Sequence, residues 1–128
     1  RHLPIEPLHA TLTDLLSDNA LRWHGVELDA PDWGRESHTL AVTMRLFGDH
    51  SLLHAMINAY WEPLDFQLPD VDVDHGAWRR CIDTALVSPQ DICRLEDAPG
   101  VDSPSYTVES RSVVVLVAPA QAPATVTR

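Results

Sequence analysis

The chain has 128 residues, the size of one ordinary domain, and 45% of them are hydrophobic, which allows a core without disulfides or a structural metal. Its net charge is -10, and all nine basic residues are Arg. A surface this acidic argues against nucleic acid and membranes as partners, because both present negative charge, whereas carbohydrate remains allowed. The chain opens with Arg1 and shows no secretion signal or membrane-spanning apolar run, so we expect an excerpt from a longer cytoplasmic protein.

The first residues carry a helical pattern. Pro7 suits the first turn of a helix, and residues 17–19 suit its end. Between them, four leucines at i, i+4, i+7 and i+8 form one apolar stripe at helical period: Leu8, Leu12, Leu15 and Leu16. We therefore predict one short helix within residues 1–20.

The next segments are typical of strands and turns. Residues 21–29 form an extended stretch, and residues 39–47 alternate between polar and apolar side chains. The apolar members of that alternation share one face: Leu40, Val42, Met44 and Leu46. Residues 52–61 are nearly all apolar, which predicts a central strand covered on both faces. Ile57 is then buried, and Ile57→Asp is expected to be severely destabilising.

The second half of the chain predicts shorter strands. Residues 64–68 alternate again, residues 78–84 form another strand, and residues 88–105 are rich in loop formers. The last two strands, residues 106–108 and 112–117, are expected to pair as a hairpin.

Short strands without helices between them indicate an all-β fold, an antiparallel β-sandwich over residues 21–118. The Ala- and Pro-rich residues 119–128 are expected to be a disordered tail. Cys81 and Cys93 could pair in principle, but the composition has no disulfide-scaffold character, and we expect reduced thiols.

No constellation in the sequence points to chemistry. Residues 70–76 resemble a calcium loop, but His75 stands where an EF-hand needs Gly, so we expect a solvated acidic loop. His50 and His54 have the spacing of a zinc pair, yet such a pair requires a helix and these fall in a turn and a strand. No carboxylate pair is marked for glycoside hydrolysis. We therefore expect no catalytic residue, no metal site and no cofactor.

Large aromatic residues have two possible uses in this chain. We favour a place in the sandwich core and its domain interface; the alternative is stacking on sugar rings. The residues concerned are Trp23, Trp33, Trp61, Trp78, Tyr60 and Tyr106. The segment from Trp23 to Trp33 is too rich in turn residues for a buried strand and too apolar for a free loop, so we expect part of it to face another domain.

A series of short segments runs in order from Leu21 to Val117, through most of the chain. The segments are Trp23-His24-Gly25-Val26, Pro31-Asp32-Trp33, Ser37 with Leu40-Ala41, Asn58-Ala59-Tyr60-Trp61-Glu62-Pro63, Phe66-Gln67-Leu68-Pro69, Trp78, Asp83-Thr84, Tyr106 and Arg111-Ser112-Val113-Val114-Val115-Leu116. Their order and spacing resemble the C-terminal domain of isoamylase-type glycogen-debranching enzymes, of the glycogen-operon kind, in the α-amylase superfamily.

The resemblance implies a non-catalytic, Greek-key-like sandwich docked on the catalytic (β/α)8 barrel of the same polypeptide, with residues 1–20 as the link from that barrel. The parent enzyme would hydrolyse α-1,6 branch points of glycogen or related α-glucans, and the domain would meet glucan through it. An independent α-glucan-binding module is the alternative. For barrel docking or glucan contact we single out Trp23, His24 and Trp33.

A second set of residues is expected to be structural: Asn58, Trp61, Trp78, Asp83, Arg111 and Ser112. Asn58 within an apolar strand predicts a buried amide bonded to the backbone of a neighbouring loop, because an unpaired amide costs about 1–3 kcal/mol. Asp83 with Thr84 predicts an Asx-type turn, and Arg111 is expected to pair with an Asp or Glu.

Overall fold

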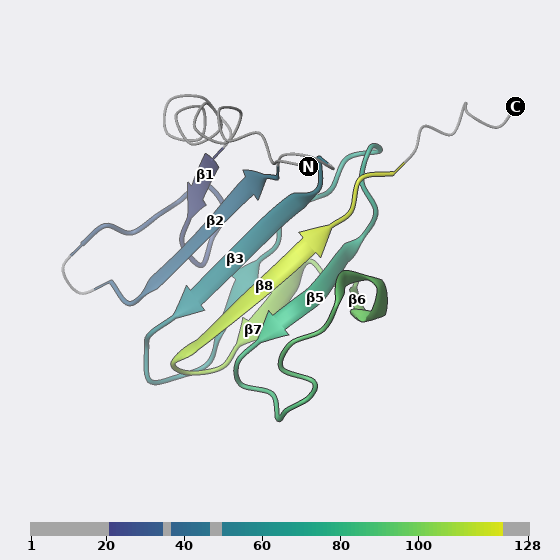
Figure 1. The fold of residues 1–128 in the computed structure, drawn as a ribbon. Coiled ribbons are helices and arrows are strands. Elements are labelled where there is room, and N and C mark those ends of the chain that lie inside the picture. Colours follow the sequence, from purple (N-terminus) through teal and green to yellow (C-terminus); the bar gives the residue numbers. More distant parts are fainter. Residues whose placement is uncertain (1–20, 35–36, 47–49, 122–128) are drawn as a thin grey trace, which may run out of the picture.

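A computed structural model describes residues 21–34, 37–46 and 50–121. They form a six-stranded antiparallel sheet in the order β1-β2-β3-β8-β5-β6 and a two-stranded antiparallel sheet of β4 and β7 (Figure 1). The elements are β1 (Leu21–His24), β2 (Thr39–Arg45), β3 (Leu52–Asn58), β4 (Leu64–Gln67), β5 (Trp78–Asp83), η1 (Leu95–Asp97), β6 (Gly100–Val101), β7 (Ser105–Val108) and β8 (Ser112–Ala118).

The prediction of an all-β antiparallel fold is confirmed. The short helix expected within residues 1–20 lies outside the described residues. In the part of the chain that the structure describes, no helix is long and apolar enough to cross a membrane.

The core lies between the two sheets. Phe66 of β4 and Val108 of β7 are fully buried against the inner face of the large sheet, where Met56, Val114 and Leu116 are also fully buried. Side chains alternate across a strand, so these positions come from every second residue of β3 and β8. In Figure 1 the large sheet faces the viewer and β7 lies behind it.

The other face of the large sheet, the outer face, is apolar across β1, β2, β3 and β8. Directly paired residues of antiparallel strands share a face, and one such row runs through Trp23, Val42, Ala55 and Val115. The outer-face residues are Leu21, Trp23, Leu40, Val42, Met44, Leu53, Ala55, Ile57, Val113, Val115 and Val117. The expected alternation in β2 is therefore present, but its large apolar residues point away from the core.

Two expectations about β3 and its partner strands are wrong. Ile57 is 40% exposed on the outer face, so β3 is not fully covered on both sides. β7 and β8 do not pair as a hairpin, because β7 pairs with β4 whereas β8 lies between β3 and β5. The turn between them, where Arg111 has a φ of 53°, carries the chain from one sheet to the other.

Ordered pairing extends past the boundary expected at residue 118. Gly76 N–H donates to Pro119 O at 2.7 Å, Gln121 N–H donates to Asp74 O at 2.8 Å, and His75 forms a bridge with Ala120. Residues 119–121 therefore belong to the fold and not to a disordered tail. They hold the acidic loop of residues 70–76 against the end of β8.

Candidate functional site

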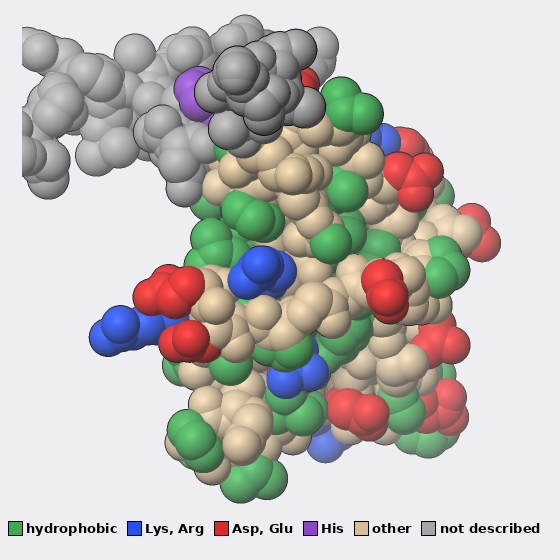
Figure 2. All heavy atoms as spheres, turned by 90° about the vertical axis from the view of Figure 1, so that its right-hand side faces the viewer, with side chains coloured by type: hydrophobic (Ala, Val, Ile, Leu, Met, Phe, Trp, Pro, Cys, Tyr) green, Lys and Arg blue, Asp and Glu red, His purple; other side chains and the backbone are tan. Residues whose placement is uncertain are grey.

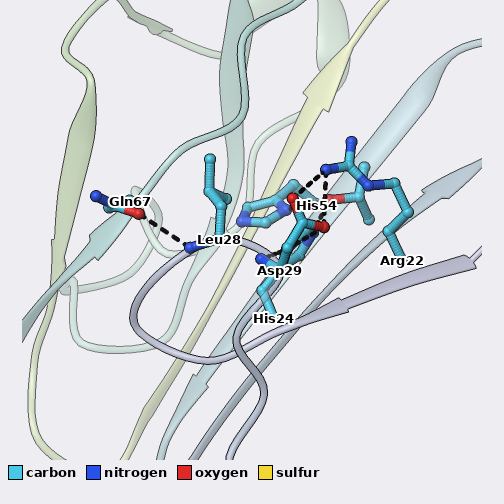
Figure 3. Close-up of polar contacts among 7 residues, drawn as sticks. Arg22, His24, Leu28, Asp29, His54 and Gln67 are labelled. Carbon is cyan, nitrogen blue, oxygen red and sulfur yellow. Dashed lines mark hydrogen bonds and ion pairs between the residues drawn. The ribbon is translucent and has the colours of Figure 1, made fainter.

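The loop that joins β1 to β2 is anchored by a buried chain of hydrogen bonds (Figure 3). Asp29 N–H donates to His24 Nδ1 at 2.7 Å, which leaves the His24 ring proton on Nε2, 2.8 Å from Thr43 Oγ1. The Thr43 hydroxyl then donates to His54 Nδ1 at 2.8 Å. His24 and His54 are both fully buried, so His24 contacts no partner from the surface, contrary to the expectation. It positions the loop from within.

Burial keeps both imidazoles neutral. Desolvation, with smaller contributions from the neighbouring His24 and Arg22, lowers the pKa of His54 to about 3. Desolvation also lowers the pKa of His24, against the opposing charge of Asp29. Nε2 of His54 has no hydrogen-bond partner among the described residues; its ring lies beside Trp78, with centroids 5.7 Å apart.

Further contacts fix the loop on its exposed side. Arg22 donates to both carboxylate oxygens of Asp29, at 2.8 and 2.7 Å. Leu28 N–H donates to Gln67 Oε1 at 2.9 Å, which ties the loop to β4 of the other sheet (Figure 3). Gly25 is required here, because a Cβ at this position would lie 2.6 Å from Ala30 O. These contacts fix residues 25–30 of the loop against β1 and β4.

Two groups of contacting aromatic rings lie near this loop. Trp23 and Trp33 meet edge to face with centroids 5.6 Å apart, His38 stacks on Tyr60 at 5.8 Å, and Tyr60 contacts Trp61 at 5.4 Å. We call these five residues the aromatic row. Trp33 and His38 line one open pocket of about 360 Å³, together with Asp32, Ser37, Leu40 and Ile57.

Three of the four tryptophans lie outside the sandwich core, so the predicted core placement is wrong for them, whereas a place in a domain interface stays a prediction. Trp33 is 66% exposed, Trp61 62% and Trp23 41%. Trp78 alone of the four is buried, and its Nε1 donates to Pro69 O at 2.8 Å. The local sequence does not separate these cases, because Trp33 and Trp78 both lie among polar and turn residues, yet only Trp78 is buried.

Asn58 holds the loop that carries Tyr60 and Trp61. Its Nδ2 lies within hydrogen-bonding distance of Glu62 O (2.9 Å), Val108 O (3.0 Å) and Glu109 O (3.2 Å), and its Oδ1 accepts from Tyr60 N–H at 2.9 Å. The buried amide thus joins the end of β3 to the end of β7. It is a positioning residue for one half of the aromatic row.

The remaining structural residues lie away from the row. Asp83 accepts from Ala85 N–H at 3.0 Å in an Asx turn, and Tyr106 Oη donates to its other oxygen at 2.6 Å. Burial and the Asp83 carboxylate raise the pKa of Tyr106 to about 12. Ser112 is buried and donates to Ser110 O at 3.0 Å. Arg111 is exposed and, within the described residues, makes no ion pair, so the expected partner is not found.

Metal and nucleophile chemistry has little support in the described chain. No group of three or more His, Cys, Asp or Glu side chains there could hold a metal ion. In the acidic loop, Asp72 Oδ1 accepts from Asp74 N–H at 3.0 Å and lies 2.6 Å from His75 Nδ1. The hydrogen-bond chain from His24 through Thr43 to His54 was not predicted, because polar residues at alternate strand positions normally indicate a face in solvent.

These features define a class: an antiparallel β-sandwich domain with a rigid aromatic edge and an apolar outer face. Residues 22–111 match the family described as Isoamylase 1-3, C-terminal. The chain therefore belongs to the family of isoamylase C-terminal domains, and the resemblance drawn from the sequence is confirmed.

Other comparisons are more distant. The chain is similar to the crystal structure of CelM2, a bifunctional glucanase-xylanase protein from a metagenome library, at 21% sequence identity and a TM-score of 0.40. The similarity covers 66% of this chain and 16% of that one, so this chain spans a small part of the other protein's length. No curated protein matches the chain.

Proposed function

We propose that the chain is the non-catalytic accessory domain of a cytoplasmic glycogen-debranching enzyme, and that it stabilises the catalytic (β/α)8 barrel of the same polypeptide by docking on it. The parent enzyme hydrolyses α-1,6-glucosidic branch points of glycogen or related α-glucans. Membership of the isoamylase C-terminal family supports the association with such an enzyme. The observation that carries the docking proposal is the apolar outer face of the large sheet.

That face suits a protein partner better than water. A single exposed apolar residue is ordinary, but a continuous apolar face on a sheet normally marks an interaction surface. The second sheet covers the inner face only, which leaves the outer face for another layer (Figure 1). Ile57 and Trp23, at 40% and 41% exposure, are the outer-face residues that such a layer would bury most.

A charged substitution at the centre of the outer face tests the docking proposal. Ala55→Asp lies on the outer face of β3, and Val73→Asp is the matched control, because Val73 is 92% exposed in the acidic loop. In the full-length protein that carries this chain, we expect Ala55→Asp to lower the midpoint of thermal unfolding and the debranching activity, and Val73→Asp to change neither. Equal behaviour of the two variants in the full-length protein would show that this face does not contact the barrel.

A second candidate function, direct α-glucan contact, is favoured by the aromatic row. Sugars bind by stacking on exposed rings and by hydrogen bonds to polar groups at the ring edges. Trp33 supplies such a ring, and Asp32 and Ser37 line the pocket beside it. The Trp61 ring, 62% exposed at the other end of the row, could stack on a further sugar unit.

Affinity electrophoresis separates the two functions. In native gels that contain glycogen, glucan contact predicts that the isolated chain is retarded and that Trp33→Ala and Trp61→Ala each reduce the retardation. Val87→Ala is the control, because Val87 is 80% exposed and lies outside the row. Mobility that glycogen does not change would leave docking as the role of the row.

A further inference from the structure

Two cysteines lie on neighbouring segments at the edge of the large sheet that β5 and β6 form. Cys81 lies in β5 and Cys93 in the segment that returns beside it, and both are free and half-buried. Cys93 N–H donates to Cys81 O at 2.8 Å. The next two residues, Ile82 and Ile92, form an antiparallel bridge. Cys81 and Cys93 therefore occupy opposed positions on neighbouring antiparallel segments.

This placement meets the geometric demand of a disulfide. Opposed residues in an antiparallel pair have Cα atoms about 4.5–5.5 Å apart, and a disulfide needs roughly 4.4–6.8 Å. Asp83 N–H donates to Asp91 O at 2.9 Å, so the two segments are held together on the other side of the bridge as well. The strand register shifts between Arg80 and Ile82, which makes Cys81 the bulged residue of β5 and frees it from pairing with β8.

We propose that Cys81 and Cys93 form a dithiol site that closes to an intramolecular disulfide when the protein meets a disulfide oxidant. The bond would fasten residues 82–92 to β5. That segment is otherwise held mainly by backbone hydrogen bonds, and Val87 and Ile92 within it are 80% and 67% exposed. Closure would restrict the unfolded chain and so stabilise the fold.

The chemistry balances with a small neutral disulfide such as bis(2-hydroxyethyl) disulfide. The Cys93 thiolate attacks one sulfur and displaces the first 2-mercaptoethanol thiolate; the Cys81 thiolate then attacks Sγ of Cys93 and displaces the second. The two cysteine protons end on the two departing thiolates, so the protein is oxidised by two electrons and the reagent reduced by two. Burial raises the pKa of the Cys81 thiol, which favours Cys93 as the first nucleophile.

The reagent should be uncharged because the chain as a whole is acidic. On the side of the molecule that carries β5 and β6, acidic side chains lie among hydrophobic and basic ones (Figure 2). The net charge of the whole chain is -10, so an anionic oxidant such as oxidised glutathione would be repelled.

The test uses the folded chain with bis(2-hydroxyethyl) disulfide and the variants Cys81→Ser and Cys93→Ser. For the wild type we expect a mass loss of two hydrogens, a peptide that joins residues 81 and 93 until it is reduced, and a melting midpoint raised by several degrees. Each single variant should keep one mercaptoethanol adduct and show no such rise.

Two results would overturn the proposal. One is a wild-type chain that ends with an adduct on each cysteine and no crosslinked peptide, which would mean that the thiols cannot meet. The other is a disulfide between two chains, seen as a dimer without reductant. Neither result bears on docking or glucan contact, because Cys81 and Cys93 belong neither to the outer-face residues of β1, β2, β3 and β8 nor to the aromatic row.

Discussion

The two faces of the large sheet reverse the usual distribution of polarity. The inner face is buried, yet it carries His24, Thr43, His54 and Asn58, each bonded to a specific partner. The outer face is only partly covered, yet its positions on β1, β2, β3 and β8 are apolar. The inner face is therefore stabilised by hydrogen bonds as well as by packing. The outer face provides apolar surface area without side-chain hydrogen bonds. The first kind of surface specifies one fold; the second suits contact with another surface.

The largest difference between the two faces is expected when the same charge is placed on neighbouring residues of β8. Val114 is fully buried on the inner face, and Val115 lies on the outer face. Val114→Asp should cost more than about 4 kcal/mol, because it buries a carboxylate without a partner, and the chain should fail to fold. Val115→Asp in the isolated chain should cost about 1–2 kcal/mol, mainly through poor strand propensity. Thermal unfolding followed by circular dichroism distinguishes them, and similar losses for both would mean that the outer face is a second core. Ile57→Asp was expected to be severely destabilising because Ile57 was predicted to be buried. Since Val114 is the fully buried residue, we expect the severe effect at Val114.

A smaller loss is expected when a directional bond is removed from the inner face. Asn58→Ala leaves the carbonyls of Glu62, Val108 and Glu109 without their shared donor. We expect a loss of about 3 kcal/mol in the free energy of unfolding, measured by urea titration. Glu62→Ala, which keeps the backbone oxygen, is the control and should stay within about 0.5 kcal/mol of the wild type. A loss as small as that of the control would assign the amide no structural role.

Acid should lower the stability of the fold through the buried histidines of the inner face. His54 has a pKa of about 3 in the fold and the ordinary value of 6.5 when unfolded, so the unfolded chain binds the extra proton between these values. The contribution of the His54 imidazole to the free energy of unfolding is complete above pH 6.5. It falls with decreasing pH and has lost about 2 kcal/mol at pH 5. The lowered pKa of His24 acts in the same direction. Urea midpoints from pH 8 to pH 5 measure the slope, and His54→Asn should reduce it; an unchanged slope in that variant would mean that His54 is not the group that titrates.

The smallest effect concerns the edge of the outer face. Trp33 is 66% exposed, so Trp33→Ala in the isolated chain should cost less than about 1 kcal/mol. If the loop that carries it docks on the barrel, the loss in the full-length protein should be larger. Equal losses in the two proteins would show that Trp33 serves the isolated domain alone, and the glycogen gels would then decide its role.

Local patterns predicted which segments are strands, but not which surface each strand faces. The alternation in residues 39–45 is a property of β2 itself, whereas the choice of Ala41 and Thr43 for the interior depends on Phe66 and Val108, which come later in the chain. The expected hairpin of β7 and β8 is wrong for a related reason: short separation favours pairing, but β8 pairs along its whole length with β3 and over residues 114–117 with β5. In the candidate site, the segment from Trp23 to Trp33 was identified from composition, but the exposure of Trp61 and the burial of His24 follow from tertiary contacts.

The position of β8 in the sheet also sets the order in which the domain can be built. β3 and β8 are central neighbours, yet residues 59–111 separate them in the sequence. Pairings between distant segments form slowly, because a long loop must close first. During synthesis, β3 can pair with β2 at once, but its other edge stays open until β8 is made, and an open apolar strand edge can template aggregation. The domain therefore folds only after β8 has been synthesised, and a message cut before the codons for β8 would yield an insoluble product.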